Sequence, residues 1–315
     1  MEGLLLLVGG YLGWAVGAND GANCVGTSVG ARLLSPRRAM AWVAVFALIG
    51  ALVGGRNVVV TVGTGIVTEG PSPLALLLAM GVVGLCVTSA TLLRLPVSTS
   101  QAVVGALAGL GWAVGAEVDV RLLTGMIAVW GLSPLLAGGL ATLLYRLGAA
   151  ILPRLRRSGV ADRLLVWVTL ASGGYAAFAL GANNLGNAVG PLAHLDFPLF
   201  PLILWGGLTI AAGALTFGYR VTQTIAYELA PIDPLGAFAV QLGIALSGHL
   251  FAFVGIPVSF SHMVVGALLG VRLAKGLSVL RPTARTVRSI LLGWVSVPAA
   301  SGLLVFLLYK LVEWI

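Results

Sequence analysis

Ten long apolar stretches, separated by short segments that hold most of the charge, constrain this chain more than any other feature of its sequence. They cover about 4–31, 39–54, 74–93, 103–116, 122–146, 164–190, 197–219, 235–254, 263–271 and 289–311. Only 9% of the residues are charged, whereas a soluble domain carries roughly 25%. Because about 20 apolar residues suffice for a helix to cross a bilayer, the sequence predicts an all-α polytopic membrane protein.

The basic residues predict which side of the membrane each loop faces. With the N-terminus outside, every Lys and Arg except Arg56, Arg121 and Lys310 falls on the cytoplasmic side, Arg94 included, as the positive-inside rule requires. No basic segment precedes the first apolar run, so this run is expected to be a membrane span and not a signal peptide. We expect a multi-pass protein of the cell membrane with both termini outside.

Some segments are expected to enter the membrane without crossing it. The stretches 39–54 and 263–271 are shorter than the roughly 20 residues of a full span, which favours half-helices or shifted boundaries. The segments 57–68 and 222–232 are candidates for re-entrant structure.

Two motifs occur twice in the chain. GANDGANCVG at 17–26 returns as GANNLGNAVG at 181–190, 164 residues later. PVSTSQAVVGALAG at 96–109 returns as PVSFSHMVVGALLG at 257–270, 161 residues later. Two paired motifs at nearly the same offset indicate a duplication.

The loop charges give the two halves opposite orientations, which predicts an inverted-topology repeat. We expect a first repeat at 1–147, a basic cytoplasmic linker at 148–163 and a second repeat at 164–315. The glycines of the GAND and GANN motifs are poor helix formers that suit either close packing or an unwound turn. The predicted fold therefore has broken helices as well as re-entrant segments.

Asp20 is the one acidic residue that the topology places at membrane depth, where a charge is costly and usually functional. No basic residue is expected at that depth to pair with it. The neighbouring amides recur at the same spacing in the second motif, which favours a shared cation site, with Asp20 as a proton carrier or as a ligand of sodium. The candidate cation-binding residues are Asn19, Asp20, Asn183 and Asn184. The alternatives are that Asp20 is a structural acid paired with a distant arginine, and that Asn183, Asn184 and Asn187 only link helices by hydrogen bonds.

Hydroxyl side chains follow Pro96 and Pro257, just before an apolar stretch. This pattern predicts a helix start with an N-cap. Inside a membrane such a start presents unpaired N–H groups and a positive dipole end, a combination that binds anions. The candidate substrate-binding residues are Ser98, Thr99, Ser100, Ser259 and Ser261, with Asn23 and Asn187 from the other motif pair. Alternatively, the hydroxyls are ordinary caps.

All four motifs, together with FGYRVTQTIAYELAPIDPLGAF at 217–238, resemble the signatures of the inorganic phosphate transporter (PiT) family, over essentially the whole chain. The resemblance implies cation-coupled import of a tetrahedral oxyanion through inverted repeats, often by a homodimer. It also implies a substrate role for His262, because His262 stands at the family's usual histidine position, where the first half has Gln101.

We therefore expect a secondary active transporter that imports inorganic phosphate with sodium or a proton. No enzymatic activity and no cofactor are expected. The expected partners are phosphate, membrane lipid and a second copy of the chain, and no nucleic acid.

Three positions depart from the family's pattern. Asn184 replaces an aspartate, Phe260 replaces a hydroxyl, and Gln241 replaces a common glutamate. Since the family includes sulfate permeases, a sulfate permease on the same fold is the main alternative. A cation antiporter is a further alternative, but it normally needs several buried acids. A passive anion channel is another alternative, and it would differ from the expected transporter only in the absence of coupling to a cation. His194 and His249 are interpreted as a loop residue and a packing residue.

Overall fold

The computed structural model describes residues 1–67, 70–95, 97–156, 161–195, 197–223, 232–277 and 284–314. Its regular structure is helical, apart from one isolated antiparallel bridge between Val67 and Val118. The all-α prediction is thus confirmed. Three predicted features lie partly outside the described residues: Pro96 before the first helix start, residues 224–231 of the segment 222–232, and residues 157–160 of the linker 148–163.

Each half of the described chain contains long helices, short helices and one turn of another helix type. The first half contains α1 (Glu2–Gly30), α2 (Pro36–Gly54), α3 (Arg56–Val60), the π-helical turn η1 (Thr61–Gly65), α4 (Pro73–Leu92), α5 (Thr99–Val114) and α6 (Val120–Arg156). The second half contains α7 (Ala161–Val189), the 3₁₀ turn η2 (Gly190–His194), α8 (Leu199–Phe217), α9 (Tyr219–Gln223), α10 (Pro234–Phe253), α11 (Phe260–Ala274) and α12 (Ala284–Trp314).

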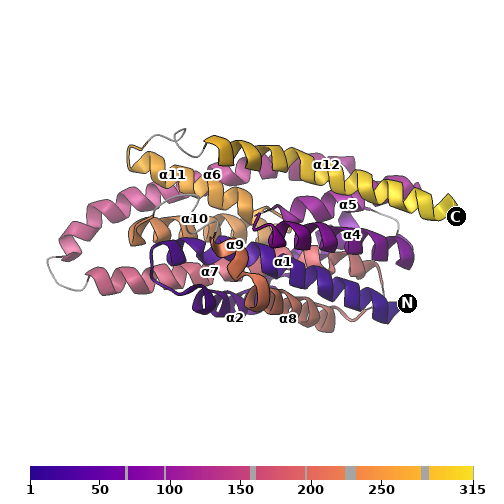
Figure 1. The fold of residues 1–315 in the computed structure, drawn as a ribbon, viewed down its shortest axis with the longest axis horizontal. Coiled ribbons are helices and arrows are strands. Elements are labelled where there is room, and N and C mark those ends of the chain that lie inside the picture. The colour runs from indigo at the N-terminus through magenta and orange to yellow at the C-terminus, as the bar shows by residue number, and fades with distance from the viewer. Residues whose placement is uncertain are drawn as a thin grey trace.

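The helices lie along one direction in an elongated bundle, with both termini at the same end (Figure 1). In the described part of the chain, seven helical segments are long and apolar enough to cross a membrane, so the protein is a multi-pass membrane protein. The predicted short stretch 39–54 belongs to one of these, α2, which begins earlier, at Pro36. The short stretch 263–271 lies in α11, which has only 15 residues and stays below full length.

The pairs α4–α5 and α10–α11 form two helical hairpins whose tips lie in the middle of the bundle (Figure 1). We call them the first and the second hairpin. The tip of the first is hydrogen-bonded to Asn19, in the interior of α1, whose Nδ2 donates to the carbonyl oxygen of Leu95 over 3.0 Å. The stretches 74–93, 103–116, 235–254 and 263–271 were interpreted as four crossings. In the structure each pair instead enters the bundle and turns back at its tip (Figure 1), and the alternative interpretation of 263–271 as a half-helix fits α11, which has 15 residues.

Helices α1 and α7 run unbroken through the two glycine-rich motifs. The glycines instead allow close packing. A Cβ atom at Gly17 would lie 1.9 Å from the carbonyl oxygen of Ile210 in α8, and one at Gly181 would lie 1.9 Å from that of Ala47 in α2. The predicted break at these motifs is therefore wrong, and the alternative of backbone-to-backbone packing is confirmed.

The short helices of the hairpins make a second pair of close contacts. A Cβ atom at Gly105 of α5 would lie 2.3 Å from the carbonyl oxygen of Pro298 in α12. One at Gly266 of α11 would lie 2.0 Å from that of Pro134 in α6. Each contact has its counterpart in the other half, and each joins helices from different halves of the chain.

Both hairpins turn through a residue with left-handed backbone conformation. The first uses Arg94, with φ 60°, and the second uses Gly255, with φ 78°. Glycine adopts this conformation freely, whereas an L side chain in it costs roughly 1–2 kcal/mol. Arg32, just after α1, is the other non-glycine residue of this kind in the described chain, also with φ 60°. Arg94 thus lies at the tip of the first hairpin, where the residue is exposed.

The variant Gly181→Ala tests the backbone contact between α7 and α2. The added methyl group meets a carbonyl oxygen, so we expect a loss of about 1–3 kcal/mol of stability, typical of overpacking. Thermal unfolding of the purified protein in detergent measures the change. The matched control is Gly139→Ala in α6, where an added Cβ meets nothing within 4 Å. Equal transition temperatures for the two variants would contradict the close contact.

Candidate functional site

Asp20 lies at the centre of a buried cluster of polar side chains, with its residue only 2% exposed. Its Oδ2 accepts hydrogen bonds from Thr99 Oγ1 and, over 2.7 Å, from Asn184 Nδ2. Its Oδ1 accepts one from Asn23 Nδ2 over 3.2 Å. The central cluster, as we call these residues together with Asn187 and Ser100, joins α1, α5 and α7. The structure therefore brings both copies of the glycine-rich motif to one place.

The cluster continues to the tip of the second hairpin. Asn187 Nδ2 donates to Ser100 Oγ over 2.8 Å, and Ser100 Oγ donates to the carbonyl oxygen of Val258 over 2.9 Å. Beyond Val258, the hydroxyl groups of Ser259 and Ser261 are hydrogen-bonded to each other at 2.8 Å. The predicted hydroxyl of Ser100 in the first half is thus hydrogen-bonded to the backbone directly before Ser259 in the second half.

The two predicted helix starts are present, each with a serine N-cap. Ser98 Oγ accepts a hydrogen bond from the backbone N–H of Gln101, and Ser259 Oγ accepts one from that of His262, each over 3.3 Å. The N-terminal ends of α5 and α11 therefore both lie at the meeting point of the hairpin tips. Their exposed N–H groups and dipoles favour negative charge there.

Asn19 and Asn183 hold the two hairpin tips. The Oδ1 atoms of Asn19 and Asn183 accept the backbone N–H of Val97 and of Val258, each over 3.1 Å. Asn183 Nδ2 donates to the Ile256 carbonyl oxygen over 3.3 Å, as Asn19 does on the first tip. Both amides therefore have a structural role, and cation binding by Asn19 and Asn183 stays a prediction.

Several buried polar atoms near these residues have no hydrogen-bond partner within the part of the chain that the structure describes. They are Oδ1 of Asn23 and Asn187, Oε1 of Gln101 and both ring nitrogens of His262. All four residues are at most 3% exposed. Since a buried polar atom without a partner is costly, these atoms suit a ligand that supplies the missing contact. Three of them are amide oxygens, which accept a cation or an O–H donor.

His262 is covered by an aromatic ring from the last helix. Its imidazole stacks on Trp294 of α12, with ring centroids 3.7 Å apart. Sequence reasoning missed Trp294, and also Thr91, whose Oγ1 accepts a 2.9 Å hydrogen bond from Asn19 Nδ2. Neither residue belongs to the two motif pairs found in the sequence, so only the long-range packing reveals it.

Gln241, which stands where the family often has glutamate, is fully buried in a separate polar group. Its Nε2 donates to Ser28 Oγ over 2.6 Å and to Thr27 Oγ1 over 3.1 Å, and its Oε1 accepts from Ser172 over 3.1 Å. Because its amide is satisfied by neutral partners, this position holds α1, α7 and α10 together without a charge.

The histidines interpreted as loop and packing residues lie apart from these contacts. His194 ends the turn η2. His249 belongs to α10 and packs against α7, where its Nδ1 lies 2.7 Å from Tyr175 Oη.

The oxygen-rich chemistry of the central cluster is compatible with the predicted cation site, and cation binding there stays a prediction. Its ligand atoms are carboxylate, amide and hydroxyl oxygens, the donors that hard cations prefer. Within the described ranges, no group of three or more His, Cys, Asp or Glu residues could hold a metal ion. The salt bridges found in the described chain involve Lys275 and Lys310, not Asp20.

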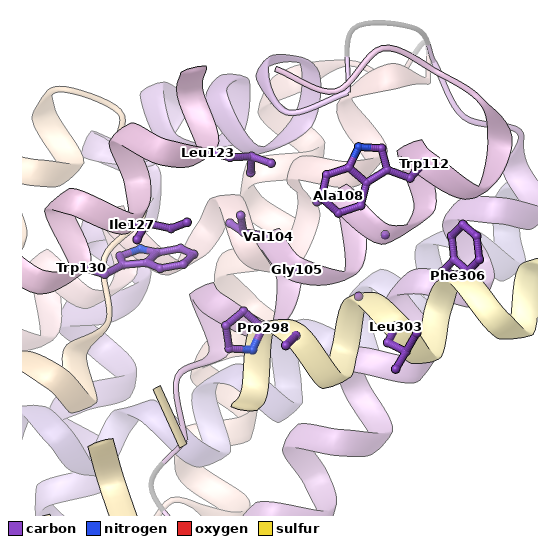
Figure 2. Close-up of a pocket in the computed structure, with 13 residues that line it drawn as sticks. Val104, Gly105, Ala108, Trp112, Leu123, Ile127, Trp130, Pro298, Leu303 and Phe306 are labelled. Carbon is purple, nitrogen blue, oxygen red and sulfur yellow. The ribbon is translucent and has the colours of Figure 1, made fainter. Parts of the chain in front are cut away.

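An apolar groove of about 470 Å³ lies between α5, α6 and α12, outside the central cluster (Figure 2). Trp112, Leu123, Trp130 and Phe306 are among the side chains that point into it (Figure 2). Its lining has almost no polar surface, so this groove is not a site for ions.

Comparison with known proteins identifies a family and a fold. Residues 16–305 match the family described as the phosphate transporter family. The chain is 27% identical to a Thermococcus kodakarensis protein named "Putative phosphate permease", over 96% of each chain. It is 28% identical to "Inorganic phosphate transporter 2-1, chloroplastic" of Arabidopsis thaliana, over 95% of this chain and 70% of that protein.

A solved structure, named "The sodium-dependent phosphate transporter", has the same fold. It matches with a TM-score of 0.86 and 23% identity, over 98% of each chain.

The variant Asn183→Ala tests the amide that holds the second hairpin tip. It leaves the buried N–H of Val258 without an acceptor, which should cost about 1–3 kcal/mol. Thermal unfolding in detergent measures the loss. The matched control is Asn57→Ala, which removes an exposed amide hydrogen bond, of 2.8 Å, to Phe253 on the same hairpin. A control as destabilised as Asn183→Ala would show that the buried amide has no special role.

Proposed function

The chain belongs to the phosphate transporter family, and on this premise we propose that it imports inorganic phosphate as a secondary active transporter driven by a cation gradient. One observation carries the proposal: the buried carboxylate of Asp20 lies where the N-terminal ends of two helices meet. A carboxylate attracts a cation and helix N-termini attract an anion. A site that holds both at once is what cotransport requires.

The cation is proposed to bind at Asp20. The unpartnered Oδ1 atoms of Asn23 and Asn187 are the nearest candidates to complete an oxygen cage. Asn184, whose Nδ2 is hydrogen-bonded to Asp20, contributes a neutral amide where the first motif has the carboxylate. The solved transporter with the same fold is named as sodium-dependent, which favours sodium. A proton carried by Asp20 itself is the other form of the same coupling.

The anion is proposed to bind between the two hairpin tips. The hydroxyls of Thr99, Ser100, Ser259 and Ser261 are the candidate donors, with His262 beside them. Dihydrogen phosphate also brings its own O–H donors, which the unpartnered oxygens of Asn23, Asn187 and Gln101 can accept. Sulfate has no such donors near neutral pH, so it would leave those oxygens unpaired, a penalty that discriminates strongly between analogues.

The proposed architecture is a pair of inverted repeats, 1–147 and 164–315, joined by the cytoplasmic linker 148–163. The pairwise contacts of equivalent residues in the two halves support it. We further propose that both termini lie outside the cell membrane and that the protein forms a homodimer.

The central cluster favours a transporter over two other classes. Its side chains are at most 2% exposed, whereas a passive channel needs an open path along its site. A cation antiporter would require several acids, and Asp20 is the one carboxylate in the cluster. Alternating access then requires the two hairpins to move apart on one side at a time.

The variant Asp20→Asn tests the cation site. Reconstituted into liposomes with sodium and proton gradients imposed separately, it should lose gradient-driven phosphate uptake while remaining folded, because the cation loses its charged ligand. The matched control Asp119→Asn changes an exposed acid that caps α6, and should transport normally. Normal accumulation of phosphate by Asp20→Asn would exclude this residue as the coupling site.

Competition between anions tests the substrate. Unlabelled phosphate should displace labelled phosphate at a lower concentration than unlabelled sulfate does, since only phosphate donates to the amide oxygens. The variant Asn184→Asp should shift the preference further from sulfate, because a second carboxylate repels a divalent anion more strongly. Displacement by sulfate at the lower concentration would assign the chain to sulfate transport instead.

A further inference from the structure

Trp294 has an equivalent in the other half of the chain. Trp130 of α6 lies four residues before Pro134, and Trp294 of α12 lies four residues before Pro298. The carbonyl oxygens of these two prolines make the close contacts with the short hairpin helices α11 and α5. The two tryptophans therefore occupy the same place in the two halves, each one turn before such a contact.

The indole N–H groups of these two residues differ in their partners. Trp130 Nε1 donates to the carbonyl oxygen of Pro257, at the tip of the second hairpin, over 2.9 Å. Trp294 Nε1 is buried and has no hydrogen-bond partner in the part of the chain that the structure describes. A buried donor without an acceptor lowers stability, and a phenylalanine would provide the ring without that loss. The N–H of Trp294 therefore suits a ligand better than it suits the fold.

The ring of Trp294 lies against His262, one of the candidate substrate-binding residues. The two ring centroids are 3.7 Å apart, and the ring planes are inclined by 25°. His262 belongs to the first turn of α11, whose N-cap is Ser259. The stacking therefore places the indole beside the N-terminal end of α11, where negative charge is favoured.

Gln101 lies level with Trp294 on the neighbouring helix α5. The close contacts on successive turns of α5 and α12 follow the same direction along both helices, so the two helices run parallel. Gln101 is one turn before Gly105, which contacts Pro298. Trp294 is also one turn before Pro298. The unpartnered Oε1 of Gln101 and the unpartnered N–H of Trp294 therefore lie at the same level of the bundle.

We propose that the indole N–H of Trp294 donates to the transported oxyanion, and that it binds an unprotonated oxygen of the anion beside His262 and Gln101. This proposal rests on the proposed function. An indole N–H donates and cannot accept, so it selects an oxygen without a proton. The amide oxygen of Gln101 accepts, so it selects an oxygen that carries one. Dihydrogen phosphate has both kinds of oxygen, whereas sulfate near neutral pH has only the first.

The variant Trp294→Phe tests the N–H group, because it keeps an aromatic ring against His262. Purified in detergent, it should unfold at the wild-type temperature or above, since it loses a donor that had no partner. Reconstituted into liposomes, it should show a KM for phosphate about tenfold higher, as expected when a charged acceptor loses one donor. An unchanged KM would mean that the N–H does not meet the anion, and would overturn the proposal.

Two matched variants separate this N–H from other indole groups. Trp130→Phe removes the donor to Pro257 and should lower the unfolding temperature. Trp205→Phe removes an exposed donor, which is bonded to the Leu6 carbonyl oxygen over 3.0 Å between α8 and α1, and should keep the wild-type KM. If Trp294→Phe unfolds at as low a temperature as Trp130→Phe, its N–H has a structural role and the proposal is overturned.

Calorimetric titration of the detergent-purified protein with phosphate and with sulfate tests the two kinds of contact. Trp294→Phe should weaken the binding of both anions in the same proportion, because both have unprotonated oxygens. Gln101→Met, which removes the acceptor, should weaken phosphate alone. A loss for phosphate alone in Trp294→Phe would overturn the proposal. If the wild type binds and carries sulfate and not phosphate, the proposed function is wrong, and the affinity of Trp294→Phe for sulfate still tests the N–H.

Discussion

The rest of the structure depends on how the backbone N–H and carbonyl groups find hydrogen-bond partners at the two hairpin tips inside the bundle. In a bilayer no water is available to pair with a free N–H or carbonyl group. Asn19 and Asn183 meet this demand, because each amide accepts one N–H and donates to one carbonyl oxygen of a tip. The next residue along each helix is Asp20 or Asn184. The groups that satisfy the tips therefore also place the carboxylate and its partner amide beside the hydroxyls of α5.

The parts of the fold that depend on local sequence could be predicted, and the parts that depend on distant neighbours could not. Ser98 and Ser259 are caps because of the residues on either side of them, and the sequence shows both. Gly17 is ambiguous by sequence, since only the carbonyl oxygen of Ile210, far along the chain, decides between an unwound turn and close packing. Hydropathy likewise identifies α4 as long and apolar enough to cross a membrane. It does not predict that the C-terminal end of α4 lies at a hairpin tip inside the bundle.

The same distinction applies to the candidate site. Asp20 was found because a lone acid in apolar surroundings is conspicuous, and its motif partners Asn23 and Asn184 do bind it. The contact between Thr99 and Asp20 joins two different motifs, and neither motif alone predicts it. Trp294 could not be found, because nothing near it in the sequence relates α12 to His262.

The contacts of Gly105 with α12 and of Gly266 with α6 have a consequence for biosynthesis. The short helix α5 packs against α12, and the short helix α11 packs against α6, so each contact joins the two halves. Helices α1 and α8 also pack together across the two halves. The ribosome delivers α1 and α5 to the membrane well before α8 and α12 exist. Until then their glycine-lined faces have only lipid as a neighbour. The packing of the first half is therefore completed only late in synthesis, because the partner of α5 is α12, the last helix to be translated.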